Sequence, residues 1–210
     1  RTLRIGRNPL ADNLDFLTLT QLERLYLNET GISSTEGIGA MTFLVELDLS
    51  DNPSLNGQIY DVHELEFLQS LDIGNTGLTD IPDISTMTDL YSLNIENNTS
   101  LTTLASGVQY SVSAGVVPVE RPLENHPSLE TLYAGGGSIL SLDGLGDMSE
   151  LSSLSIWGNR ISNFSGIGSM PNLRWIDAGS NRLTNIDAIV GAPNIESLYL
   201  WDNRIATLPS

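Results

Sequence analysis

The strongest constraint on the fold is an internal repeat of 22 residues. The pattern LxxLxLxxNxL recurs along the chain, with its leading position at residues 22, 44, 68, 90, 129, 151, 173 and 195. The steps between these positions are 22 residues, except for one of 24 and one of 39. Such a period predicts a solenoid, in which each repeat forms one coil and buries its apolar face only by stacking on its neighbours.

The pattern inside each repeat predicts two kinds of local structure. Alternating apolar residues, such as Leu25 and Leu27, indicate a short strand with one buried face. The remainder of a repeat carries an apolar residue at every third position, which is the period of a 3₁₀ helix. The asparagine at the ninth position is expected to point inward and to bond backbone groups that would otherwise be buried unpaired. These asparagines are Asn8, Asn52, Asn98, Asn159, Asn181 and Asn203.

On these residues the sequence resembles the leucine-rich repeat family, and the 22-residue period resembles its internalin-type class, which is found on bacterial surfaces. The resemblance covers nearly the whole chain, including the segment MPNLRWIDAGSNRLTNIDAIVGAPNIESLYLWDNRI. It implies an α/β fold, a right-handed solenoid of about ten coils, with a parallel sheet on the concave face and 3₁₀ turns on the convex face. Leucine-rich repeats serve unrelated tasks, so the resemblance leaves the function open.

The domain organisation is expected to be one solenoid over residues 1–210. Neither end carries an atypical capping repeat, so we expect the chain to be a segment of a larger protein. The irregular region is 99–128, within the 39-residue step. A degenerate extra coil, with Tyr110, Val112 and Val117 in apolar repeat positions, is favoured there over a surface loop insertion.

The charge and the composition of the chain limit the classes of partner that it is expected to bind. The net charge is -17, which would repel a phosphate backbone, so nucleic acid is not expected as a partner. Residues 25–120 contain fourteen carboxylates and no arginine or lysine, so a basic partner or a cation remains possible. No apolar stretch is long enough for a membrane helix, so membrane insertion is not expected. Oligomeric state is left open.

No residue pattern predicts catalysis. The chain has no cysteine, and its two histidines, His63 and His126, are expected on the surface of coils about three repeats apart. The glycines at 135–137 are interpreted as a tight turn rather than a phosphate loop, since no lysine follows them. We therefore predict no enzymatic activity, no cofactor and no metal site.

The informative residues lie on the exposed face of the strands, where stacking places equivalent positions in columns. All three tryptophans fall in these columns within the last three coils. The predicted ligand-binding site consists of Tyr133, Trp157, Trp175, Asp177, Tyr199 and Trp201. Exposed aromatic residues serve as anchors in protein and sugar interfaces. The alternation of glycine and tryptophan at these positions predicts a slot above Gly179, between Trp157 and Trp201. The alternative is that the aromatic rings only pack on one another or cover a further coil.

A second set of columns is acidic. It contains Glu46, Asp48, Asp72 and Glu96 on coils three to five, where like charges one strand apart repel unless a cation or a basic partner neutralises them. A solvated acidic face is the favoured interpretation of this possible patch, ahead of a cation site.

These observations predict a non-enzymatic recognition module that binds a partner protein on its concave face. The resemblance implies an extracellular or cell-surface location. Two alternatives remain: a glycan-binding module of a secreted protein, and an intracellular regulatory subunit built on the same repeat.

Overall fold

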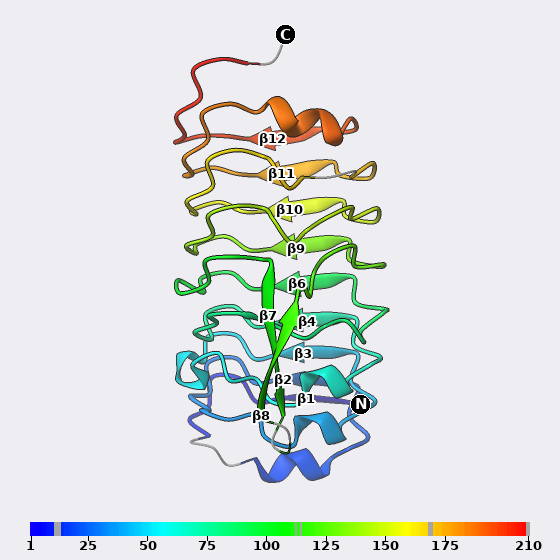
Figure 1. Ribbon diagram of the computed structural model, residues 1–210. Helices are drawn as coiled ribbons and strands as arrows, with labels where there is room; N and C mark the ends of the chain where they lie inside the picture. Colours follow the sequence, from blue (N-terminus) through cyan, green and yellow to red (C-terminus); the bar gives the residue numbers. More distant parts are fainter. Residues whose placement is uncertain (11–13, 112, 114, 168–169, 209–210) are drawn as a thin grey trace.

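The computed structural model describes residues 1–10, 14–111, 113, 115–167 and 170–208. The chain winds into a stack of coils, and its two ends lie at opposite ends of that stack (Figure 1). Each coil adds one three-residue strand to a nine-stranded parallel sheet. In spatial order the strands are β1 (Thr2–Arg4), β2 (Arg24–Tyr26), β3 (Glu46–Asp48), β4 (Ser70–Asp72), β6 (Ser92–Asn94), β9 (Thr131–Tyr133), β10 (Ser153–Ser155), β11 (Trp175–Asp177) and β12 (Ser197–Tyr199).

The sheet has the register that the repeat predicts. Leu25 lies opposite Leu47, and the other strands pair in the same way, so equivalent repeat positions form straight columns. The central residue of each inner strand is buried, because the second residue of a three-residue strand points to the face opposite its neighbours. The prediction of one parallel sheet is confirmed for the strands containing Leu25, Leu47, Leu71, Leu93, Leu132, Leu154, Ile176 and Leu198.

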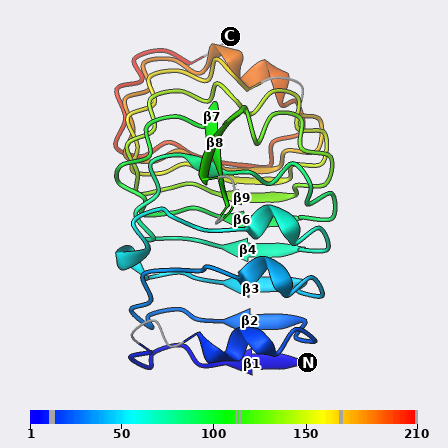
Figure 2. The same cartoon turned by 60° about the horizontal axis from the view of Figure 1, so that its bottom comes forward.

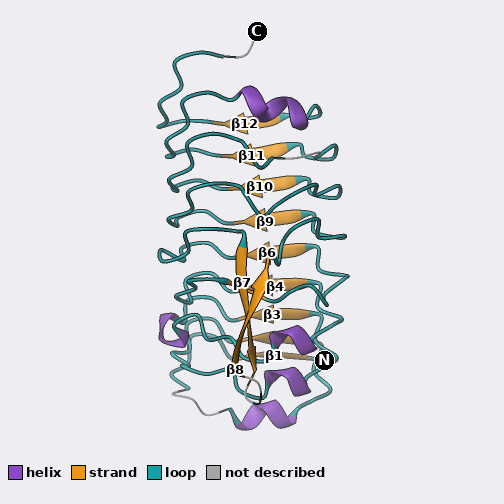
Figure 3. Cartoon of the chain, in the orientation of Figure 1, coloured by secondary structure: helices purple, strands orange, loops and turns teal. Residues whose placement is uncertain are grey.

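The convex side returns through short turns, with few helical residues (Figure 3). Its apolar residues at every third position are buried, as at Ile161, Phe164, Ile167 and Met170. Where a coil has no 3₁₀ helix, isolated i to i+3 bonds remain, such as that from the Leu173 N–H to the Met170 carbonyl at 3.2 Å. The 3₁₀ helices are η1 (Asp15–Thr18), η2 (Ile38–Ala40), η3 (Pro53–Leu55), η4 (Val62–Glu64) and η5 (Asp187–Gly191).

The ninth-position asparagines form a buried ladder that ties each coil to the one before it. The Asn52 amide donates to the carbonyls of Leu27 and Leu49, at 2.9 and 2.8 Å. Its Oδ1 accepts from the backbone N–H groups of Thr30 and Gly31, at 3.0 and 2.8 Å. The inward asparagine is therefore confirmed for Asn52, and bonds of the same kind are made by Asn98, Asn159, Asn181 and Asn203. The prediction is wrong for Asn8, which is exposed and donates to carbonyls of its own first coil.

The 39-residue step contains a β-hairpin and no extra coil. β6 pairs directly with β9, with Leu93 opposite Leu132, so the predicted degenerate coil is wrong. Two longer strands, β7 (Ser106–Ser111) and β8 (Gly115–Glu120), pair antiparallel, and β7 also pairs with β5 (Ile81–Pro82). Val112 lies outside the described residues. The sheet consequently has nine strands instead of the ten that the extra coil required.

The hairpin runs along the stack, across the coils, as Figures 1 and 2 show from two directions. The Asp83 N–H donates to the Val108 carbonyl at 2.9 Å and the Asp61 N–H to the Tyr110 carbonyl at 2.8 Å, so β7 contacts the convex returns of two earlier coils. A hairpin strand and a coil strand both alternate apolar and polar residues, so periodicity alone could not separate them. The length of the step could have separated them. Without residues 106–120 the 39-residue step becomes one of 24 residues, which matches the step from position 44 to position 68.

We expect the hairpin to be removable without loss of the solenoid. The Arg121 N–H donates to the Ala105 carbonyl at 3.0 Å, so the chain enters and leaves the hairpin at one point. Replacing residues 106–120 by Gly-Gly should leave a protein that unfolds cooperatively, at a lower temperature because the β7 contacts are gone. Circular dichroism during thermal denaturation measures this. A deletion variant without a cooperative transition would show that the hairpin is essential to the stability of the solenoid.

Candidate functional site

The concave face is built from the outer residues of the three-residue strands and from the residue two positions beyond each strand. Because the register is straight, this last position forms a column across five successive coils: Glu96, Gly135, Trp157, Gly179 and Trp201. Glycine alternates with tryptophan over the last four of these positions. The column thereby brings the acidic and the aromatic candidate residues onto one continuous line.

Each indole of this column folds back over the glycine of the preceding coil. A methyl group placed on Gly135 would lie 2.3 Å from Nε1 of Trp157, and one on Gly179 would lie 2.2 Å from Cε2 of Trp201. The indole of Trp201 thus occupies the space above Gly179, so the expected slot between the two tryptophans is not open. Glycine at both positions is required by this close approach of the rings.

Trp157 is held by the acidic end of the column. Its Nε1 donates to Oε1 of Glu96 at 3.0 Å, and the Ser155 hydroxyl donates to the same oxygen at 3.2 Å. Trp157 is half-buried in this arrangement. One of the predicted anchors is therefore partly structural, and Glu96 binds that tryptophan instead of belonging to an independent acidic patch.

The remaining predicted ligand-binding residues gather at the C-terminal end of the sheet. The rings of Trp175 and Tyr199 lie 5.9 Å apart between centroids, at an angle of 55°. The Asp177 carboxylate accepts from the Gly179 N–H at 2.9 Å, and both Trp175 and Asp177 are half-buried. Three of the six predicted residues are well exposed: Tyr133 at 38%, Tyr199 at 47% and Trp201 at 55%. We call the surface formed by these three residues and Trp175 the aromatic site.

The carboxylates of the acidic patch are hydrogen-bonded within the protein, and Glu46 is also paired with a cation. Oε1 of Glu46 accepts from the Arg24 guanidinium at 3.0 Å, and Oε2 accepts from the Tyr26 hydroxyl. The Tyr26 hydroxyl and Arg24 lower the pKa of Glu46, against an opposing effect of burial. Oδ1 of Asp48 accepts from the backbone N–H and the hydroxyl of Ser50, at 3.0 and 2.6 Å.

Asp72 behaves differently from its neighbours because it is desolvated. Burial raises its pKa, and the nearby carboxylates of Asp48 and Asp51 act in the same direction. Bonds from the Gly74 N–H at 3.0 Å and from the Asn94 amide at 3.1 Å oppose that shift. Within the described residues, no three side chains of histidine, aspartate or glutamate gather as ligands for a metal ion.

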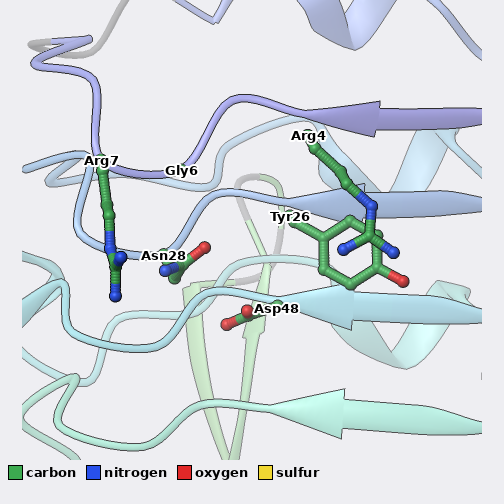
Figure 4. Close-up of a pocket in the computed structure, with 6 residues that line it drawn as sticks. All are labelled: Arg4, Gly6, Arg7, Tyr26, Asn28 and Asp48. Carbon is green, nitrogen blue, oxygen red and sulfur yellow. The ribbon is translucent and has the colours of Figure 1, made fainter.

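A depression of about 400 Å³ at the N-terminal end of the concave face was not predicted from the sequence (Figure 4). The Arg4 guanidinium lies 3.8 Å above the centroid of the Tyr26 ring, and Asn28 and Asp48 line the same depression. Arg7 also lines it, with its Nε bound to Glu29 at 2.8 Å. The available signal was the cluster of arginines at positions 1, 4, 7 and 24 next to a long segment that has none.

The two histidines do not lie on the surface as expected. His126 is buried beneath the convex side, and burial lowers its pKa, while the backbone carbonyls of Ile84 and Met87 oppose that effect. His63 is half-buried, with Nε2 3.3 Å from the Glu64 carboxylate. The expectation of a surface position is thus wrong for His126, because it fills the core where the chain rejoins the stack after the hairpin.

Comparison with known proteins assigns the repeat. The family model described as "Leucine Rich repeats (2 copies)" matches residues 67–108, the fourth and fifth coils of the stack. These two coils match leucine-rich repeats, and the whole stack has the fold of a leucine-rich repeat solenoid. No curated protein matches it.

Three solved structures show how widely the fold is shared. A leucine-rich repeat protein of Leptospira interrogans is 21% identical with a TM-score of 0.66, and the alignment covers 100% of this chain and 56% of that one. A chain of the Drosophila Toll–Spatzle complex is 18% identical with a TM-score of 0.73, and the alignment covers 99% of this chain and 27% of that one. Internalin C2 of Listeria monocytogenes is 20% identical with a TM-score of 0.56, and the alignment covers 99% of this chain and 70% of that one. At these identities the likeness establishes the fold alone.

The leucine-rich repeat fold commonly mediates protein–protein recognition, and proteins of this family are typically non-enzymatic binding modules. The chain spans about half the length of the Leptospira protein that it matches. Within the described residues, no helix has both the length and the apolar character needed to cross a membrane.

Proposed function

We propose that this leucine-rich repeat solenoid is a non-enzymatic recognition module that binds a partner protein at the aromatic site. The observation that carries the proposal is the exposure of Tyr133, Tyr199 and Trp201 along the last four strands of the concave sheet, where Tyr133 and Tyr199 share one column three strands apart. Leu132, the central residue of the Tyr133 strand, is buried, and Leu198, the central residue of the Tyr199 strand, is partly buried against the core, so the exposed rings contribute little to the core. An exposed aromatic cluster of this kind is rarely kept by a soluble protein without an interaction to serve.

The polar groups around the rings support a directional contact. The carboxylate of Asp177 lies in the same column as Tyr133 and Tyr199, and Glu96 lies in the column of Trp201. Aromatic side chains ringed by polar groups are the usual composition of the centre of a protein interface. Trp201 is the most exposed of the rings and is therefore the expected anchor.

The proposed location is the bacterial cell surface. It rests on the 22-residue repeat, which resembles the internalin-type class, and on the acidic composition of the chain. Antibodies raised against the chain and applied to intact cells test it, because they label only protein that is displayed outside the cell. Labelling that needs permeabilised cells would contradict the proposal and favour an intracellular regulatory subunit.

We expect Trp201→Ala to abolish most of the binding while leaving the fold intact. Loss of an anchor residue costs about 2 kcal/mol or more in binding free energy, which is about thirtyfold in Kd. The wild-type chain and the variant serve as baits for affinity capture, and the captured protein is then titrated by calorimetry. The matched control is Leu140→Ala, which removes an equally exposed apolar side chain outside the concave strands.

The outcomes separate the alternatives. A partner protein retained by Leu140→Ala but lost by Trp201→Ala supports the proposal. Trp201-dependent binding to a glycan array, with no captured protein, would replace the protein partner by a sugar. A fall in melting temperature of Trp201→Ala far beyond that of Leu140→Ala would show that the ring is structural.

A further inference from the structure

A second apolar surface lies on a different side of the protein, where the chain enters the strands of coils three to five. Phe43 is 53% exposed and Phe67 is 57% exposed, and they occupy the same repeat position, immediately before the leading leucine. Neither phenylalanine belongs to the columns of the concave face. The signal in the sequence is this repeated phenylalanine at a position where the other repeats are more polar or smaller.

The two phenylalanines line a groove of about 310 Å³, which we call the flank groove. Val45 and Gln69 line it as well, and the Gln69 N–H donates to the Val45 carbonyl at 2.9 Å, so these two residues are neighbours on adjacent coils. Asp89, from the following coil, is the fifth lining residue. The groove therefore combines two aromatic rings and an aliphatic side chain with a single carboxylate.

Asp89 is exposed, and among the described residues its carboxylate has no hydrogen-bond or ion-pair partner. The surrounding sequence supplies no cation either, because residues 25–120 contain fourteen carboxylates and no arginine or lysine. The nearest arginine before this segment, Arg24, is already bound to Glu46 at 3.0 Å. An occupant without positive charge would desolvate Asp89 at a cost and gain no compensating bond.

We propose that the flank groove binds an arginine side chain from a basic segment of a partner protein. An arginine supplies an aliphatic stem for the apolar walls and a planar guanidinium that stacks on phenyl rings. The same guanidinium can donate two parallel N–H bonds to a carboxylate such as Asp89. Lysine carries its charge as a compact and strongly hydrated ammonium, so it fits an aromatic groove less well. The acidic zone around the groove would attract the basic segment over a longer range.

The test uses synthetic peptides, since the partner is not identified. A library of nine-residue peptides with a fixed central arginine and varied flanks is bound to the intact chain, and the tightest binder is labelled for fluorescence anisotropy. Four versions of that peptide are compared, with arginine, lysine, citrulline or leucine at the centre. Citrulline has nearly the shape of arginine without its charge, so it isolates the contribution of the cation.

We expect at least a tenfold weaker Kd for the citrulline and leucine peptides. Asp89→Asn and Phe67→Ser should each weaken the arginine peptide at least fivefold, and Leu140→Ala should leave its Kd unchanged. Trp201→Ala should also leave it unchanged, which separates this site from the aromatic site. Circular dichroism of each variant checks that the exposed substitutions leave the fold intact.

Three results would overturn the proposal. One is equal binding of the arginine and leucine peptides, which would make the groove a purely apolar site. Another is insensitivity to both Asp89→Asn and Phe67→Ser. The third is a dimer in sedimentation velocity that Phe67→Ser converts to a monomer, because the groove would then be covered by a second copy of the chain.

Discussion

Replacing Asn52 by alanine is expected to lower the free energy of unfolding by about 3 kcal/mol or more. The substitution leaves the backbone N–H groups of Thr30 and Gly31 and the carbonyl of Leu49 without their bonds to the amide. The Leu27 carbonyl still accepts from the Thr30 hydroxyl at 2.6 Å. Thr30 and Leu49 are buried, whereas Gly31 is exposed and its bond to Asn52 is only partly buried. Each buried backbone group left unpaired costs about 1–3 kcal/mol, so two of them together with the Gly31 N–H exceed the effect of most single substitutions.

The matched control is Asn8→Ala, at the equivalent position of the first coil. Asn8 is exposed and donates to the carbonyls of Ile5 and Gly6 within its own coil, at 3.0 and 3.1 Å. Water can replace those bonds, so we expect a loss of about 1 kcal/mol or less. Urea denaturation of both variants gives the comparison. Equal midpoints would mean that the buried ladder adds no more to stability than a surface asparagine does.

Gly144→Ala is expected to destabilise the solenoid by about 2–5 kcal/mol, through strain and overlap together. Gly144 has φ +103°, a conformation that side chains rarely adopt. Its new methyl carbon would lie 2.5 Å from the Leu104 carbonyl oxygen and 2.6 Å from Cα of Ala105, on the preceding coil. Both contacts are to backbone atoms, so no side-chain rotation can relieve them. Gly166, one repeat later, makes the same close approach to Leu142.

Gly31→Ala separates the two contributions. Gly31 has φ +71°, and a methyl group placed on it would meet nothing within 4 Å. This variant should therefore show the cost of the backbone conformation alone, about 1–2 kcal/mol. Thermal and urea denaturation measure both variants. If Gly144→Ala were no less stable than Gly31→Ala, the convex backbones of adjacent coils would not be in contact as the structure has them.

For the candidate site, the sequence predicts which residues lie in the columns of the concave face, but not how exposed each ring is. The repeat placed Trp157, Trp175 and Trp201 on the concave face, and the structure puts them there. Their exposure depended on where each ring turned, since Trp157 turns toward Glu96 and Trp175 packs on Tyr199. The strand columns do not predict the flank groove, because Phe43 and Phe67 lie immediately before the leading leucine, outside those columns.

The sequence by itself determined the coil stack, its register and its buried asparagine ladder. Each of these depends on a local pattern repeated at a fixed spacing, because stacking similar repeats brings equivalent positions of adjacent coils side by side. Only the tertiary structure decided that residues 106–120 leave the stack as a hairpin, and that Trp201 covers Gly179. Those outcomes depend on side-chain rotation and on contacts between different coils, where several packings satisfy the same repeat and the neighbouring atoms select one.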